Sequence, residues 1–104
     1  MTPATDNITI YKYNDFARLY EFVDDTTDWS GVSFKAEMRN VDNELIATFE
    51  TEKDDVNHRL KIVLTKEIIA DIPLGIYLFD LVRESDMRFI IIQGNVLVKE
   101  GVTH

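Results

Sequence analysis

The sequence predicts an all-β domain, an antiparallel β-sandwich of about seven strands with one short helical turn near residues 65–71. Two observations carry this prediction. From Ile8 onward the apolar residues recur with a period of two, in segments rich in β-branched and aromatic residues that suit a half-buried sheet. Stretches dense in Asp, Asn, Thr, Ser and Gly separate these segments, as turns separate the short strands of a sandwich.

The chain has 104 residues, enough for one buried core and too few for two domains. Residues 1–6 show no periodicity and predict a flexible arm, so residues 7–104 form the single expected domain. The predicted strands are Ile8–Lys12, Phe16–Val23, Val32–Arg39, Leu45–Thr51, Arg59–Leu64, Ile76–Glu84 and Arg88–Lys99.

The third predicted strand shows the clearest alternation. Val32, Phe34, Ala36 and Met38 alternate with polar residues, which indicates one buried and one solvated face.

A helical turn is expected where the fifth predicted strand ends. Thr65 can cap a turn over residues 66–70, and Pro73 and Gly75 stop it.

The last two predicted strands form a hairpin around Ser85-Asp86. A two-residue loop there pairs Glu84 with Met87. The resulting register turns one set of apolar residues of the hairpin inward. It leaves another set facing outward, where a two-sheet domain offers no second layer to pack against. The outward set is a possible protein interface: Leu78, Val82, Phe89 and Ile91.

Charge and composition exclude several classes of partner. Nineteen acidic and eleven basic residues give a net charge of −8, which repels nucleic-acid phosphates and anionic lipid headgroups. We therefore expect neither nucleic acid nor membrane as partner. The start of the sequence lacks the features of a signal peptide, and no apolar run approaches the roughly 18 residues of a membrane helix. A protein made without export is expected.

No catalytic apparatus is evident, and we expect no enzyme and no cofactor. There is no cysteine, the glycines are isolated, and the two histidines, His58 and His104, lack the partners of a triad or zinc site. One acidic loop leaves calcium binding open, although its spacing matches no defined calcium loop. Its carboxylates are Asp24, Asp25 and Asp28.

Three aromatic residues suggest an alternative function, a module that recognises host surface glycan. Trp29, Tyr11 and Tyr13 are of the kind that stack on sugar rings. Trp29 also has a structural interpretation, because it directly precedes the third strand and can plug one end of the sandwich.

A longer pattern of strand and turn residues resembles small immunoglobulin-like β-sandwich proteins and domains of tailed bacteriophages and prophages. The amino-terminal domain of upper baseplate proteins is one setting of such a sandwich. The pattern consists of Tyr11-Lys12-Tyr13-Asn14-Asp15-Phe16, the run from Trp29 to Arg39, Leu64-Thr65, the run from Ile72 to Leu81, the run from Gly94 to Val98, and Gly101-Val102-Thr103.

The resemblance implies an immunoglobulin-like sandwich and a structural or assembly role, with no catalytic residue to carry over. The expected protein is an interaction module of the baseplate, tail or head-tail region. Its expected partners are other phage structural proteins, further copies of itself, or both. Its expected location is the host cytoplasm during assembly, and the finished virion is a second expected location.

Overall fold

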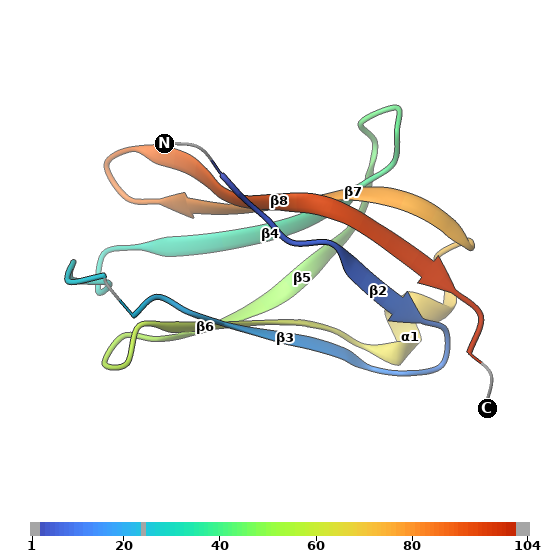
Figure 1. The fold of residues 1–104 in the computed structure, drawn as a ribbon, viewed down its shortest axis with the longest axis horizontal. Coiled ribbons are helices and arrows are strands. Elements are labelled where there is room, and N and C mark those ends of the chain that lie inside the picture. The colour runs from blue at the N-terminus through green and yellow to red at the C-terminus, as the bar shows by residue number, and fades with distance from the viewer. Residues whose placement is uncertain (1–2, 24, 102–104) are drawn as a thin grey trace.

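The computed structural model describes residues 3–23 and 25–101, which form strands and one short helix (Figure 1). The helix, α1, covers Lys66–Ala70. The strands are β1 (Ala4–Thr5), β2 (Ile8–Tyr11), β3 (Phe16–Glu21), β4 (Ser33–Arg39), β5 (Leu45–Asp54), β6 (Arg59–Leu64), β7 (Gly75–Glu84) and β8 (Arg88–Lys99).

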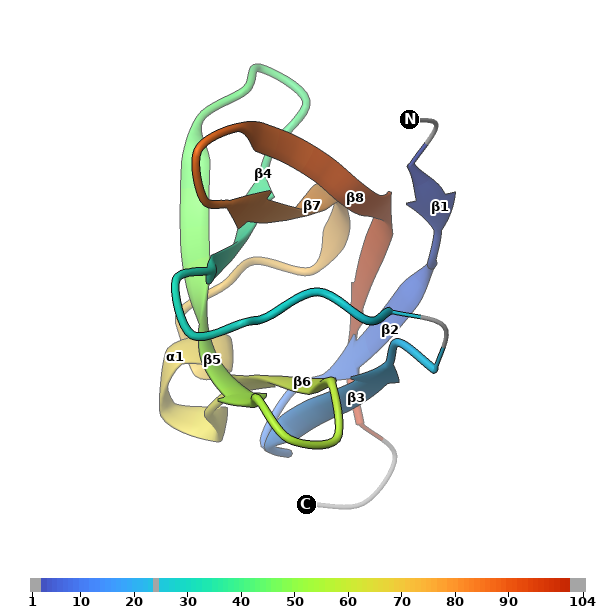
Figure 2. The same cartoon turned by 90° about the vertical axis from the view of Figure 1, so that its left-hand side faces the viewer.

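The strands form one continuous curled sheet whose two halves pack face to face (Figure 2). Their order is β1-β8-β7-β4-β5-β6-β3, and β2 also pairs with β8. Strand β5 belongs to both halves: it pairs with β4 up to Phe49 and with β6 from Glu50 onward. We call the half around β4, β7 and β8 sheet A, and the half around β6 and β3 sheet B.

All seven predicted strands are present, with ends shifted by up to a few residues. The largest shift is in β5, which continues to Asp54 rather than Thr51. The structure adds β1 within residues 1–6, where Ala4 and Thr5 pair in parallel with Ile92 and Gln93. The sequence interpretation missed this pairing because two residues are too few to show a period.

The core lies between the two halves of the sheet and is built from the inward residues of both. Ala36 and Met38 are fully buried, which confirms the predicted alternation in β4. Three rings cross the interior in edge-to-face contact, with Phe49 between Phe16 and Phe79 at centroid distances of 6.0 and 5.7 Å. Such contacts add to the apolar burial that holds the halves together.

Gly94 is the point where the amino-terminal segment crosses sheet A. A Cβ atom built on Gly94 would lie 2.0 Å from the carbonyl oxygen of Asp6. Two bonds hold this crossing: Asp6 N donates to Gln93 O, and Asn95 N donates to Asn7 Oδ1, both at 3.0 Å. The absence of a side chain therefore lets β1 and β2 lie along β8.

Asp6 also joins the two edges of the curled sheet. Its Oδ2 accepts a hydrogen bond of 2.6 Å from the Tyr20 hydroxyl of β3, and its Oδ1 lies 3.7 Å from Arg18 Nη1. Burial raises the pKa of Tyr20, and the hydrogen bond to Asp6 raises it further, so the phenol stays a donor at neutral pH. This contact ties the segment before β2 to the far edge of sheet B.

The short helix predicted near residues 65–71 is confirmed, but its expected cap is not. Thr65 occupies the N-cap position without a side-chain hydrogen bond. Asp15 instead accepts a hydrogen bond of 2.7 Å from Lys66 N through its Oδ1. In the described part of the chain, no helix is long and apolar enough to cross a membrane.

Candidate functional site: the outer face of sheet A

The predicted outward set of apolar residues is only partly exposed. Leu78 and Phe89 are exposed, as expected. Val82 is buried, with 4% of its surface exposed, and Ile91 packs partly buried against the core. Ile90, which the predicted register turned inward, is exposed instead. The expected exposure of Val82 and Ile91 is therefore wrong, although Val82 lies on the outer face across from Lys35.

The cause of this difference is the hairpin itself. The loop has three residues rather than two, so Glu84 pairs with Arg88, and Ser85 N donates to Met87 O. A bulge follows, because Leu81 pairs with Ile92 whereas Val82 pairs with Ile90. The longer loop makes Ile90 rather than Phe89 face outward, and the bulge leaves Ile91 as an extra residue.

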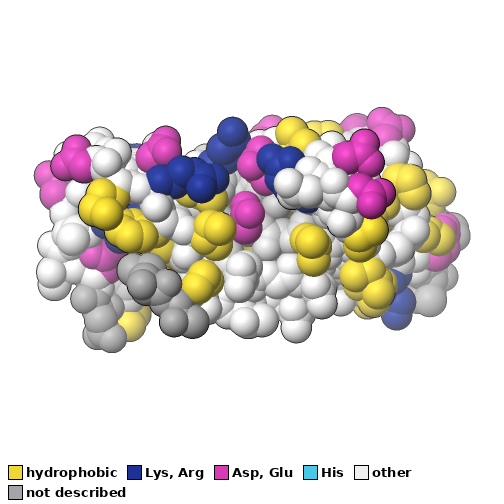
Figure 3. Space-filling view, turned by 90° about the horizontal axis from the view of Figure 1, so that it is seen from above, with side chains coloured by type: hydrophobic (Ala, Val, Ile, Leu, Met, Phe, Trp, Pro, Cys, Tyr) yellow, Lys and Arg dark blue, Asp and Glu magenta, His cyan; other side chains and the backbone are white. Residues whose placement is uncertain are grey.

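Exposed apolar side chains lie toward both ends of the outer face of sheet A, with charged side chains between them (Figure 3). Near the start of β7, Ile76 is 64% exposed and lies across from Leu97, which is 37% exposed, with Leu78 two residues further along β7. We call Ile76, Leu78 and Leu97 the apolar patch. The hairpin end exposes Ile90 on this face and Met87 in the loop, whereas the exposed Phe89 pairs with Arg83 on the opposite face of the two strands.

This face is nearly balanced in charge, unlike the protein as a whole. By the alternation of the strands it carries four of the eleven basic residues and three of the nineteen acidic ones. Its basic residues are Lys35, Arg39, Arg88 and Lys99, and its acidic residues are Glu37, Asp80 and Glu84. The excess of acidic residues therefore lies elsewhere in the chain.

A polar hollow of about 510 Å³ lies between the two apolar ends. Its floor includes a row of cross-strand neighbours, in which Glu37 of β4 pairs with Asp80 of β7 and Asp80 pairs with Gln93 of β8. Asn95 and Leu78 also line it. Sequence reasoning missed this hollow because its lining comes from distant parts of the chain, from Thr5 to Asn95.

Asp80 is the group in the hollow that most lacks hydrogen-bond partners. Its Oδ1 is buried and has no hydrogen-bond partner among the described residues. Burial raises the pKa of this carboxyl, and the neighbouring charge of Glu37 raises it further, while Arg39 and Arg88 act in the opposite direction.

Replacing Asp80 with asparagine is expected to raise the free energy of unfolding at pH 7. Because the pKa of Asp80 is higher in the folded state than in the unfolded chain, its ionised form destabilises the fold, and this penalty disappears as the pH falls. Urea unfolding of both proteins at pH 7 and pH 4 measures the difference. Asp42→Asn, in the exposed β4–β5 turn, is the control. A difference that does not depend on pH would contradict the prediction.

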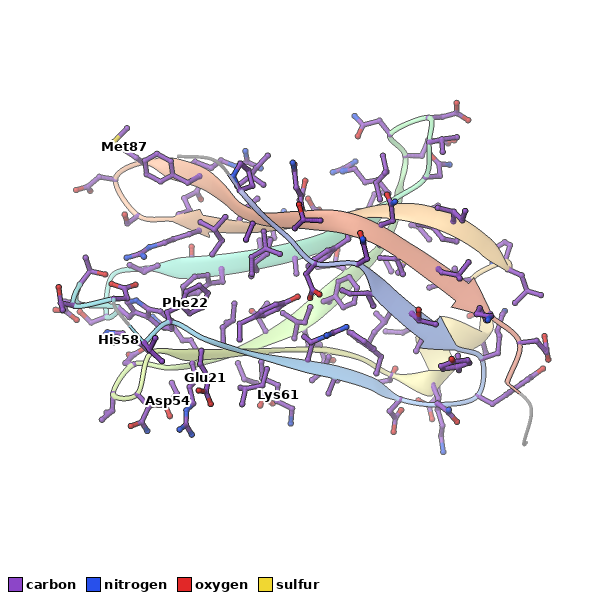
Figure 4. The ribbon with its side chains drawn as sticks, viewed as in Figure 1. Glu21, Phe22, Asp54, His58, Lys61 and Met87 are labelled. Carbon is purple, nitrogen blue, oxygen red and sulfur yellow. The ribbon has the colours of Figure 1, made fainter. Side chains whose placement is uncertain are left out.

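The end of the sandwich beside the β7–β8 hairpin holds the predicted glycan residue Trp29, which is buried with 1% of its surface exposed. Its ring packs against Phe22, Phe34 and His58 at centroid distances of 5.5, 4.9 and 4.9 Å. Figure 4 shows Phe22 and His58 at this end of the sandwich. Trp29 therefore plugs one end of the domain, and its expected role in glycan stacking is wrong because no face of the ring is accessible.

Asp25 fastens this plug. Its Oδ2 accepts hydrogen bonds of 3.0 Å from Trp29 Nε1 and Arg83 Nη1, and its Oδ1 accepts bonds from the amide and hydroxyl of Thr27. Burial opposes ionisation, but the bonds from Thr27 and Trp29 and the charge of Arg83 outweigh it and hold the pKa of Asp25 well below its usual range.

The loop considered for calcium is organised around these internal bonds. Asp25 is engaged by Thr27, Trp29 and Arg83, and Asp28 accepts a bond of 2.9 Å from Ser30 N. Asp24 lies outside the described residues. Within residues 3–23 and 25–101, no three His, Asp or Glu side chains are placed to hold a metal ion.

The other aromatic candidates lie at the far end of the sandwich from Trp29, at the end of β2 and in the β2–β3 turn beside α1 (Figure 1). Tyr11 and Tyr13 are both exposed, and the backbone of Tyr13 is left-handed with φ 72°. The fold therefore does not bring them together with Trp29.

The histidines provide no catalytic arrangement in the described region. His58 Nε2 lies 2.8 Å from the carbonyl oxygen of Thr27, so the ring holds the loop around Trp29. His104 lies outside the described residues.

Comparison with known proteins relates the fold, and only the fold, to solved structures. No family model and no curated protein matches the chain. One similar solved structure is that of the extracellular domains of the voltage-gated sodium channel β4 subunit, described as parallel homodimers that explain its role in cell–cell adhesion. It shares 9% sequence identity at a TM-score of 0.56, over 98% of this chain and 97% of that one. This likeness and the strand content confirm the predicted immunoglobulin-like β-sandwich.

Proposed function

We propose that this chain is a non-catalytic structural module that associates with a second copy of itself through the outer face of sheet A. The observation that carries the proposal is the apolar patch, Ile76, Leu78 and Leu97, exposed on the nearly neutral face of a strongly acidic protein. Exposed apolar groups rimmed by polar ones mark contact surfaces.

Charge complementarity favours a second copy as the occupant. The band between the apolar ends carries both signs, with Lys35, Arg39 and Arg88 near Glu37, Asp80 and Glu84. A two-fold axis through such a band can set basic groups of one copy against acidic groups of the other. The remaining surfaces are acidic in both copies and repel each other, which restricts association to this face.

The area that a stable dimer must bury is compatible with the size of this face. A stable interface buries about 800 Å² on each partner. That is roughly an eighth of the 6629 Å² surface of this protein. The similar extracellular domain forms parallel homodimers, but at 9% identity that likeness shows the fold and leaves association to experiment.

The biological setting that we propose is a phage or prophage particle, with the module acting in the virion or its assembly. This setting is supported by the resemblance of the strand and turn residues to phage sandwich domains. Association with copies of itself through one face suits such a role, since phage structures are built from repeated subunits.

Sedimentation analysis over a wide concentration range tests the association. We expect the wild-type protein to form dimers and an Ile76→Glu, Leu97→Glu double variant to bind its copy at least about 100-fold more weakly, because two unpaired charges would be buried.

A matched control makes the same chemical change elsewhere. Val23→Glu and Val56→Glu replace two valines that are highly exposed away from sheet A, so this double variant should dimerise like the wild type. A wild-type monomer at every concentration, or equal dimerisation of all three proteins, would refute the proposal.

A further inference from the structure

We propose that the edge of β8 that holds β1 and β2 also docks the same segment of a second copy, so that two copies exchange their amino-terminal strands. We call residues 3–11 the amino-terminal segment. The inference goes beyond the proposed function, because strand exchange uses a different surface and needs no contact between the outer faces of sheet A. It is supported by the turn that joins the segment to the rest of the domain.

The turn over residues 12–15 joins two strands that do not pair with each other. Among the described strands, β2 pairs only with β8 and β3 pairs only with β6, and the two strands separate from their common turn (Figure 1). The β4–β5, β5–β6 and β7–β8 turns, by contrast, join strands that are hydrogen-bonded to each other. Straightening residues 12–15 therefore breaks no strand ladder.

The same turn contains a residue with a strained backbone. Tyr13 has φ 72°, in the left-handed region that a bulky side chain rarely adopts and that is unfavourable for any L-residue with a Cβ atom. In an extended hinge Tyr13 returns to the β region, so exchange releases this strain in both copies. Short hinge loops under strain favour such exchange.

Exchange preserves the contacts that the segment makes with the rest of the domain. Asp6 donates to Gln93 O and accepts from the Tyr20 hydroxyl, and these bonds can form equally well when the partners lie in different copies. The bond that closes the turn on itself runs from Asn14 N to Tyr11 O and is long, at 3.3 Å. Opening the turn therefore costs little in hydrogen bonding.

The occupant that best fits the vacated edge of β8 is the identical segment of a second copy. Ile8 and Ile10 are buried in the same core cluster as Val96 and Val98 of β8, so departure of the segment would expose this part of the core to water. The space left by Gly94 admits the crossing whichever copy supplies the segment. An identical segment restores the same burial, as in other domain-swapped dimers.

A designed disulfide identifies which copy supplies the segment, because the chain has no cysteine of its own. Thr5 of β1 and Gln93 of β8 are exposed register partners, and both are replaced with cysteine. The pair is placed in the Ile76→Glu, Leu97→Glu variant, so that any dimer does not come from the outer face of sheet A. The protein is refolded from urea at high concentration, and the dimer is isolated by size exclusion and oxidised after dilution. We expect disulfides between chains, which hold two chains together on a non-reducing gel.

A second cysteine pair is the matched control. Ser33→Cys and Glu84→Cys join exposed register partners on β4 and β7, which do not exchange, so the same dimer should form this disulfide within one chain. A dimer in which the Thr5→Cys, Gln93→Cys pair also closes within one chain would overturn the inference.

Substitutions of the hinge test the role of strain in the same background. Tyr13→Gly should give a dimer dissociation constant at least about 30-fold higher than Tyr13→Val, because glycine tolerates the closed turn, valine does not, and each dimer has two hinges. Both variants remove the tyrosine ring, so the comparison isolates the backbone. Asn43→Gly, at a left-handed residue of the β4–β5 turn with φ 65°, should leave dimerisation unchanged.

Sedimentation analysis after long equilibration measures these constants. Equal values for Tyr13→Gly and Tyr13→Val, or a Tyr13→Val protein that stays monomeric at every concentration, would overturn strand exchange. A dimer that is lost in the Ile76→Glu, Leu97→Glu variant belongs to the outer face of sheet A, whereas an exchanged dimer persists there. The proposed function and strand exchange can therefore fail independently of each other.

Discussion

Replacing Trp29 with alanine is expected to lower the free energy of unfolding by about 3–5 kcal/mol, as for other large buried aromatics. The indole is fully buried among Phe22, Phe34 and His58, so its loss leaves a cavity at one end of the core. It also removes a donor from Asp25, whose carboxylate is held by several such bonds. Urea unfolding followed by circular dichroism measures the change.

Two further variants separate these contributions. Trp29→Phe keeps most of the packing and loses the bond to Asp25, so about 1–2 kcal/mol is expected. Val23→Ala, at an exposed position nearby, should change stability by less than about 0.5 kcal/mol. If Trp29→Ala were as stable as the wild type, the plug would carry no structural role.

Replacing Gly94 with alanine is expected to destabilise the protein by about 1–3 kcal/mol, the range for overpacked sites, or more. A Cβ atom would lie 2.0 Å from Asp6 O and 2.7 Å from Asp6 C, and both are backbone atoms that cannot rotate away. The segment before β2 must therefore move off β8. That movement would break its bond to Gln93 and the contact between Asp6 and Tyr20.

Hydrogen exchange identifies where the damage occurs. Faster exchange is expected at Asp6 and in β2, which depend on the crossing, while β5 and β6 keep their protection. Gly31→Ala is the matched control, because no atom lies within 4 Å of a Cβ built there. Equal stability of the two alanine variants would show that the amino-terminal segment does not need the glycine.

The predictable part of the fold was local in origin. The period of two in Ala36 and Met38 follows from burial on one face of a strand, and this signal lies within a few consecutive residues. The helix before Pro73 was also predictable from a few consecutive residues. Its true capping partner, Asp15, is 51 residues away and has no signal in the local sequence.

The candidate site was predictable only in part, because it depends on register. Leu78 and Phe89 were expected to be exposed and are exposed. One additional loop residue then placed Ile90, rather than Phe89, across from Val82 on the outer face, because a shift of one residue turns a strand's side chains to the opposite face. Turn composition did not distinguish a two-residue loop from a three-residue loop.

By itself, the sequence determined the class of the protein: an acidic, strand-rich sandwich with no recognisable catalytic motif. Tertiary structure alone decided that Trp29 is inaccessible, that Gly94 admits the amino-terminal segment, and that Glu37 and Asp80 share one hollow. The physical reason is the range of the interactions. The alternation of buried and exposed residues is a property of a single strand, so consecutive residues show it. A surface is formed by side chains that strand pairing brings together from distant parts of the chain.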